Sequence, residues 1–253
     1  MTYCLAIKVQ EGLVCLADGR LTAGSQVTNA RKLSQHGSEN ARFCVMTSGL
    51  RSLRDKTIAY LERALRDTRS APDNMLQAVE IYCRALRQVG EEDGAALEKA
   101  ELPFNLHAIV AGRLGGDGTP QVFLVYPEGN WIEIDERTPY LSIGATAYGK
   151  PILDRALKHD TPLRTALKLA YLSFDSTRFS SADVGFPIDL LTLPRGDKRW
   201  RAAHYEYDDL MEQRTWWNRH ITELAGKMPD GPWLDTLLPP PGAPSRLSLV
   251  TDD

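Results

Sequence analysis

The sequence has no apolar run that approaches the 18 or so residues a membrane-spanning helix needs. Its N-terminal stretch lacks the basic segment and the long apolar core of a secretory signal peptide. Positive charge is not in excess either, because 30 Lys and Arg stand against 33 Asp and Glu, giving a net charge of −3. A protein without a basic field is poorly suited to nucleic acid. We therefore expect a cytoplasmic protein that neither crosses a membrane nor binds nucleic acid as its main partner.

Several catalytic and cofactor motifs are also missing. The four cysteines form no CxxC pair and lie in apolar runs, which is typical of small buried side chains rather than of a disulfide or a nucleophile. The five histidines include no HExxH spacing, and no GxSxG elbow is present. The glycine-rich stretch 115–118 lacks the GK[ST] ending of a phosphate loop, so a hairpin turn is favoured there. The sequence predicts neither a metal nor a cofactor.

Hydropathy periodicity predicts most of the elements in the 253 residues. Strands are expected at 2–9, 13–17, 32–33, 42–46, 106–112, 121–126, 131–134, 140–144 and 187–193, and a polar loop lies between the second and third of them. Helices are expected at 50–69, 74–89 with Asp73 as N-cap, 151–158, 162–174 and 205–226, with a charged linker at 90–103 and a Pro-rich tail from Met228.

The order of these elements indicates the fold class. Strands and helices occur in groups rather than in βαβ alternation, which disfavours a parallel Rossmann-type sheet. Two antiparallel sheets packed together, each covered on its outer face by a helix pair, would bury the apolar faces well. We therefore predict an α+β fold with four layers in the order αββα, in a domain spanning 1–227 followed by the tail 228–253.

One group of residues near the start carries chemistry. Thr2 follows the initiator Met directly, and a small second residue normally allows Met1 to be removed. A threonine whose own α-amine serves as base is a known type of nucleophile. A nearby lysine, such as Lys32, would lower the pKa of that amine by like-charge repulsion. A buried lysine needs a carboxylate partner, and Asp18 at the end of the second strand could supply it. Taken singly, each of these residues has an ordinary structural interpretation; their order along the chain is what favours catalysis.

The same segment resembles the start of proteasome β-type subunits, which are N-terminal-nucleophile hydrolases, and in particular those of the Anbu-type bacterial homologues. Three stretches carry the likeness: the segment 2–24, SIGATAYGKPILDRAL at 142–157 and SFDSTRFSSADVGFPIDL at 173–190. They keep their order over nearly 190 residues.

The resemblance implies roles for individual residues. Thr2 matches the catalytic threonine, Asp18 the aspartate that orients the lysine, and Lys32 the lysine that tunes the amine. The backbone N–H of Gly49 matches the oxyanion donor, and the helix that begins nearby would point its positive end at the same place. The supporting serine of the family falls in Gly144-Ala145-Thr146, where Thr146 is the candidate substitute. The candidates for the family's later Asp and Ser are Asp175, Ser176 and Ser181.

The resemblance implies a threonine-type peptidase that needs no cofactor, cleaves peptides or unfolded proteins and assembles into a ring-like homo-oligomer. The exposed Trp216-Trp217 pair and its amphipathic helix would then form subunit contacts. Two alternatives stay open: a proteasome-like scaffold with little peptidase activity, and an amidase for small molecules on the same fold. The sequence identifies no substrate and no ATP-dependent unfoldase.

Overall fold

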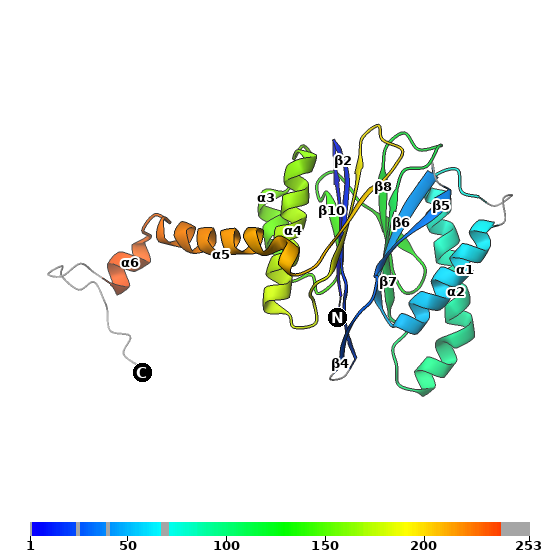
Figure 1. The fold of residues 1–253 in the computed structure, drawn as a ribbon. Helices are drawn as coiled ribbons and strands as arrows, with labels where there is room; N and C mark the ends of the chain where they lie inside the picture. The colour runs from blue at the N-terminus through cyan, green and yellow to red at the C-terminus, as the bar shows by residue number, and fades with distance from the viewer. Residues whose placement is uncertain (1, 24–25, 39–40, 67–70, 239–253) are drawn as a thin grey trace. The chain divides into compact units, whose positions relative to one another are not determined.

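The computed structural model describes residues 2–23, 26–38, 41–66 and 71–238 (Figure 1). These residues form two compact units, which meet between Asp209 and Leu210. Among the helices described, none combines the length and the apolar character needed to cross a membrane. The boundary expected between a domain 1–227 and a tail 228–253 stays a prediction.

The first unit contains two five-stranded antiparallel sheets, as the sequence predicts. One sheet has the order β10-β1-β2-β11-β12, from β1 (Tyr3–Val9), β2 (Gly12–Asp18), β10 (Tyr140–Gly144), β11 (Ile188–Pro194) and β12 (Arg201–Tyr205). The other has the order β5-β6-β7-β8-β9, from β5 (Leu33–Ser38), β6 (Ala41–Gly49), β7 (Leu106–Gly112), β8 (Gln121–Val125) and β9 (Trp131–Glu133).

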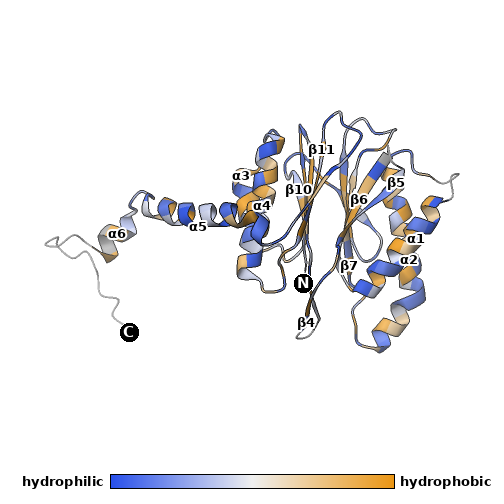
Figure 2. Ribbon diagram, viewed as in Figure 1, coloured by the Kyte–Doolittle hydropathy of each residue, from blue (hydrophilic) through white to orange (hydrophobic). Residues whose placement is uncertain are grey.

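Helices cover the outer faces of both sheets, which gives the predicted αββα layers (Figure 1). One pair is α1 (Arg51–Arg66) and α2 (Met75–Lys99), and the other is α3 (Lys150–Ala156) and α4 (Leu163–Ser180). Apolar residues are frequent in the strands of both sheets (Figure 2). The buried residues of the helices include Leu53 and Leu61 of α1, Val79 of α2 and Leu169 of α4. Because strand side chains alternate between faces, each sheet has one face in the inter-sheet core and the other beneath helices.

Two buried clusters show this alternation along β6. Cys44 and Met46 belong to the core between the sheets, whereas Phe43 and Val45 belong to the core under α1 and α2. All four cysteines are buried and unbonded, as their apolar surroundings predict. The sulfur atoms of Cys15 and Cys44 lie 3.6 Å apart between the two sheets.

The structure corrects several predicted elements. The polar segment after Asp18 forms a small hairpin, β3 (Arg20–Ala23) with β4 (Gln26–Asn29), rather than a loop. Helix α2 continues to Lys99 through the segment predicted as a charged linker, and its N-cap is Asn74 rather than Asp73, with the Asn74 side chain accepting from the N–H of Gln77. Helix α4 runs six residues past the expected end at Phe174.

The end of the chain also differs from the prediction. Residues 201–205 form strand β12, so the following helix begins later than expected. The second unit begins at Leu210 and contains α5 (Met211–Gly226) and the short helix α6 (Pro232–Leu237), which lies inside the predicted tail. The rest of that tail, 239–253, lies outside the described residues.

Candidate active site

A buried ion pair lies near the start of β1 and joins the end of β2 to the residue just before β5. The Nζ atom of Lys32 is 2.8 Å from Oδ1 of Asp18, with 4% of the lysine side chain and none of the aspartate side chain exposed. Two charges this deeply buried are stable only when they are paired and hydrogen-bonded further. The N–H of Tyr3 donates to the same Oδ1 at 2.7 Å, and the N–H of Gly185 donates to Oδ2 at 3.4 Å.

These contacts oppose the effect of burial on the carboxyl group. Burial raises the pKa of Asp18 above its usual value, while the Lys32 ammonium and the two backbone N–H donors favour the ionised form. The Tyr3 contact also fixes the place of Thr2, because Thr2 is the residue directly before it. The pair therefore contacts the residue that directly follows the candidate nucleophile.

Thr2 is held from the other side by strand β10. Its carbonyl accepts a hydrogen bond from the N–H of Ala145 at 2.7 Å. Gly144 makes this approach feasible, because a Cβ there would lie 1.8 Å from the Thr2 carbonyl oxygen and its φ is +89°. The Thr2 side chain is 8% exposed and reaches a pocket of about 420 Å³ that Thr146 also lines. The structure thus brings Thr2 and Thr146 to one pocket.

The N–H of Gly49 points out of the β6–β7 ladder. Leu50 donates to Asn105 of the β7 side, whereas Thr47 donates to Lys32 on the β5 side. Because N–H directions alternate along a strand, the N–H of Gly49 points to the same side as that of Thr47. The register of β5 with β6 ends at the pair Leu33 and Met46, so Gly49 lies beyond the paired part of β5. Its N–H is directed toward the Lys32 side, immediately before α1, as an oxyanion donor would be.

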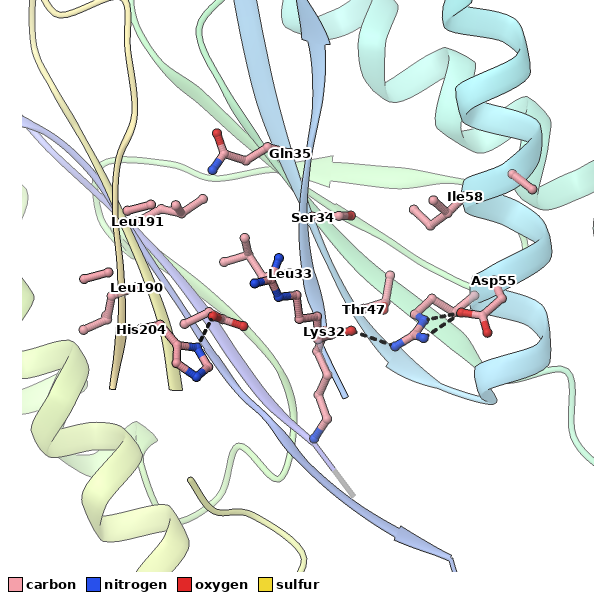
Figure 3. Close-up of a pocket in the computed structure, with 16 residues that line it drawn as sticks. Lys32, Leu33, Ser34, Gln35, Thr47, Asp55, Ile58, Leu190, Leu191 and His204 are labelled. Atoms are coloured by element: carbon pink, nitrogen blue, oxygen red, sulfur yellow. Dashed lines mark hydrogen bonds and ion pairs between the residues drawn. The ribbon is translucent and has the colours of Figure 1, made fainter. Parts of the chain in front are cut away.

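A larger pocket of about 890 Å³ opens beside Lys32 (Figure 3). It lies between the edge strand β5, helix α1 and the strands β11 and β12, and Leu190, Leu191 and Ile58 provide apolar walls. At its rim, Nδ1 of His204 lies 2.7 Å from Oδ1 of Asp189, and this contact raises the pKa of the histidine. Arg54 is held by the carbonyl of Arg31 at 2.8 Å and by Asp55.

Three further candidates lie on or just after α4. The carboxylate of Asp175 is buried and is engaged by Arg178, whose Nη2 is 2.6 Å away. Ser176 is half-buried on the same helix. Ser181 ends the helix: its N–H donates to Thr177, and its carbonyl accepts from Val184, the residue before Gly185. Of the three, only Ser181 belongs to the turn that brings an N–H to Asp18.

Sequence reasoning missed three polar residues of the Thr2 pocket: Ser48 on β6, Asn105 just before β7 and His107 on β7. They come from segments that meet Thr2 only through sheet packing, so no local spacing marks them. One feature of the sequence pointed to Ser48: it directly precedes Gly49, the candidate oxyanion donor. Among the residues described, no group of three or more His, Cys, Asp or Glu side chains is arranged to hold a metal ion.

Comparison with known proteins shows the family of the chain. The sequence pattern of the family described as "Proteasome subunit" matches residues 2–193. The chain belongs to the proteasome subunit family. Its solved structural neighbours are Anbu proteins, so the predicted relationship is confirmed at the level of the Anbu type.

Three such structures illustrate the similarity. A Gly-1 mutant of Anbu from Hyphomicrobium sp. strain MC1 is 31% identical, with a TM-score of 0.83 over 91% of this chain and 99% of that one. Anbu from Yersinia bercovieri, described as an ancestral beta-subunit, is 28% identical, with a TM-score of 0.80 over 90% and 98%. The Anbu chain in the helical assembly of the Anbu complex from Pseudomonas aeruginosa is 31% identical, with a TM-score of 0.84 over 91% of this chain and 98% of that one. No curated protein sequence matches the chain significantly.

Proposed function

We propose that this chain is a cytoplasmic, proteasome-type threonine peptidase whose nucleophile is the Thr2 hydroxyl after Met1 has been removed. The observation that carries the proposal is the buried Lys32–Asp18 pair, anchored to the N–H of Tyr3 one residue from Thr2. A buried lysine–aspartate pair costs desolvation energy and is weak evidence for stability alone. The pair lies close to Thr2, which becomes the N-terminal residue once Met1 is removed. This position suits a role in activating the Thr2 amine and hydroxyl.

The reaction follows from the groups in place. The free amine of Thr2 takes the hydroxyl proton as Oγ attacks the substrate carbonyl, and the N–H of Gly49 donates to the developing oxyanion. The Lys32 ammonium lowers the pKa of the amine, so the amine is unprotonated near neutral pH. When the C–N bond breaks, the protonated amine gives its proton to the leaving nitrogen, and an ester remains on Thr2. Water then attacks the ester, its proton passes through the amine to Oγ, and the acid is released.

Self-association belongs to the same proposal. The Pseudomonas aeruginosa relative forms a helical assembly, and α5 of this chain exposes Trp216, Ile221 and Leu224. Apolar side chains that gather on one helix are typical of a contact surface. We propose that the chain forms a homo-oligomer through this helix, with peptides or unfolded segments as substrates.

The decisive experiment exploits the dependence on a free N-terminus. We expect a version with a permanent N-terminal tag to fold but to lack activity, because the Thr2 nitrogen is then an amide without basicity. A version whose tag is cleaved to leave Thr2 first should be active, with intact mass confirming the new end. Thr2→Ala at the same end is the matched control and should be inactive. Full activity of the permanently tagged version would exclude amine-assisted catalysis.

Covalent labelling separates the other interpretations. A peptide boronate or epoxyketone should modify Thr2 in the untagged protein. Absence of labelling in protein that has lost Met1 would favour a scaffold, for which the Gly144-Ala145-Thr146 sequence in place of the family's serine is the specific observation. Labelling by small electrophiles together with hydrolysis of small amides, but not of peptides, would favour an amidase.

A further inference from the structure

The pocket of about 420 Å³ that Thr2 lines has a distinctive chemistry. It lies between strands of the two sheets, and its lining combines hydroxyl, amide and imidazole groups with two aliphatic side chains: Thr2, Ser48, Asn105, His107, Leu124, Ser142, Ile143, Gly144 and Thr146. None of these described residues is a carboxylate, a lysine or an arginine. The larger pocket shares no lining residue with it and carries several charged groups.

Strand β6 separates the two pockets. Thr47 lines the larger pocket and Ser48 lines the smaller one, as alternation along a strand requires. Gly49, the next residue, is the oxyanion candidate. A peptide whose scissile carbonyl is held at Gly49 and Thr2 can therefore place the groups on its two sides in two different pockets.

We propose that the smaller pocket binds the leaving-group side of the substrate, and that it favours an uncharged, hydrogen-bonding side chain on the residue after the scissile bond. This inference rests on the proposed peptidase function and goes beyond it by naming a substrate class. His107 is the specificity-determining residue. Serine, threonine, asparagine and glutamine are the side chains with this chemistry.

The orientation of His107 supports this assignment. Its Nδ1 lies 3.2 Å from Oδ1 of Asn105, and its ring packs edge-on against Tyr126 with 6.1 Å between centroids. With Nδ1 engaged by the amide oxygen, Nε2 is the ring nitrogen left for a ligand. Ser48 lies close to Gly144, because its Oγ would be 3.3 Å from a Cβ on that residue, and it lines the same pocket as Thr2. The pocket thus offers an imidazole nitrogen and serine hydroxyls to one polar group.

The chemistry of the second half-reaction places the leaving group in this pocket rather than in the larger one. Water must take the position that the amine vacates before it can attack the ester. A pocket lined by hydroxyls and by the nucleophile itself holds such a water well. The larger pocket has apolar walls from Leu190, Leu191 and Ile58, which suit a retained side chain of the acyl part.

Two matched peptide series test the proposal. In one series the residue after the scissile bond is serine, asparagine, leucine or aspartate, and in the other the residue before it varies. We expect kcat/KM to be about fivefold higher for serine or asparagine than for leucine after the bond, the ratio that one net hydrogen bond typically provides. His107→Leu, which keeps the approximate volume, should bring this ratio to about one while leaving preferences before the bond unchanged. Ser48→Ala, a smaller change that guards against misfolding of the first variant, should reduce the ratio in the same direction.

Controls separate this proposal from the proposed function. Gln35→Leu, in the larger pocket, should shift preferences before the bond only. A peptide boronate carries only the acyl side, so it should label Thr2 equally in the parent and in His107→Leu. The protein could be labelled and could cleave peptides while the His107 and Ser48 variants leave the preference for the residue after the bond unchanged, or alter only the preference before it. Either result would overturn the pocket assignment alone. Absence of both labelling and cleavage in the parent would overturn the peptidase function, and this inference with it.

Discussion

Individual residues explain why this site is built from backbone as much as from side chains. Asp18 receives two N–H donors in addition to Lys32, and the Thr2 carbonyl receives the N–H of Ala145. Such contacts fix the main chain on both sides of the candidate nucleophile. The side chains can then remain few, because the strands determine the geometry.

Replacement of Lys32 by alanine tests the central pair. Asp18 would remain fully buried without its counter-charge, so the free energy of unfolding at pH 7 should fall by about 3 kcal/mol. Peptidase activity should fall at least about a hundredfold, the scale of a lost electrostatic partner. Lys168→Ala, an exposed lysine on α4, is the matched control and should change stability by less than about 0.5 kcal/mol. Chemical denaturation and peptide hydrolysis on both variants give the result.

The pH dependence of that variant provides an independent check. Burial already raises the pKa of Asp18, and loss of the lysine raises it further. A carboxyl group whose folded pKa exceeds its unfolded pKa binds its proton more readily in the folded state, so stability increases as pH falls. The deficit of Lys32→Ala relative to the parent should therefore be smaller at pH 5 than at pH 7. An equal deficit at both values would contradict the burial of a charged Asp18.

At the scale of elements, hydropathy periodicity predicted the regular strands and helices. It missed elements that are stabilised by contacts with other parts of the fold. The β1–β2 hairpin and the meander from β7 to β9 followed directly from alternation and turn residues. The second half of α2 did not, because Gly90, Gly94 and a run of acidic residues suggested a linker. In the folded protein Lys56 of α1 lies 2.7 Å from both Glu92 and Asp93, which supports that half of the helix. Strand β12 is the edge strand of its sheet and pairs with β11, so its own five residues carried little signal.

Gly94 allows this helical extension to be tested. A Cβ at Gly94 would meet no atom within 4 Å, and the residue lies inside α2. Gly94→Ala should therefore raise the free energy of unfolding by about 0.5–1 kcal/mol, because alanine loses less backbone entropy in a helix. Gly112→Ala is the contrasting variant: its Cβ would lie 2.9 Å from the Cβ of Phe43, so it should destabilise the protein. Destabilisation by Gly94→Ala would contradict a helix through this segment.

The edge strand β5 contains a buried histidine with a predictable pH response. Nε2 of His36 lies 2.7 Å from Ser34, and Nδ1 lies 2.5 Å from Glu62 on α1. Burial lowers the pKa of His36, and this effect outweighs the opposing contact with Glu62. The unfolded chain therefore binds a proton near pH 6.5 that the folded protein accepts only at lower pH. The contribution of neutral His36 to the free energy of unfolding is therefore fully present above about pH 6.5, and it is lost as the pH falls below that value.

Thermal melts between pH 7.5 and 5.5 test that response. His36→Gln should weaken the decline in stability over this interval, because the titrating group is gone. Glu62→Gln should steepen it, because the carboxylate that favours the protonated ring has been removed. An unchanged pH slope in His36→Gln would show that His36 does not govern stability in this range.

At the scale of the whole molecule, family membership and the four-layer fold were predictable because ordered motifs extend over most of the chain. The composition of the Thr2 pocket was not, because Ser48, Asn105 and His107 meet Thr2 only after two sheets have packed. The division of the chain at Asp209 was not expected either, since the long helix was predicted to begin at Tyr205. Helix α5 is amphipathic by spacing alone, and spacing does not identify what covers its apolar side.

Self-association provides the test at this scale. On α5, Trp216, Ile221 and Leu224 fall within one side of the helix at 100° per residue, and all three are at least half exposed. If this side forms the contact between copies, the double variant Ile221→Glu with Leu224→Glu places two carboxylates in an apolar interface and should convert the oligomer to smaller species. Thr222→Glu lies on the opposite side of the same helix and should leave the assembly intact. Sedimentation of the three proteins at equal concentration, with melts to confirm folding, measures the effect. An unchanged oligomer in the double variant would show that the contact between copies lies elsewhere. Loss of assembly in Thr222→Glu as well would indicate that added charge on α5, rather than loss of its apolar side, disrupts the oligomer.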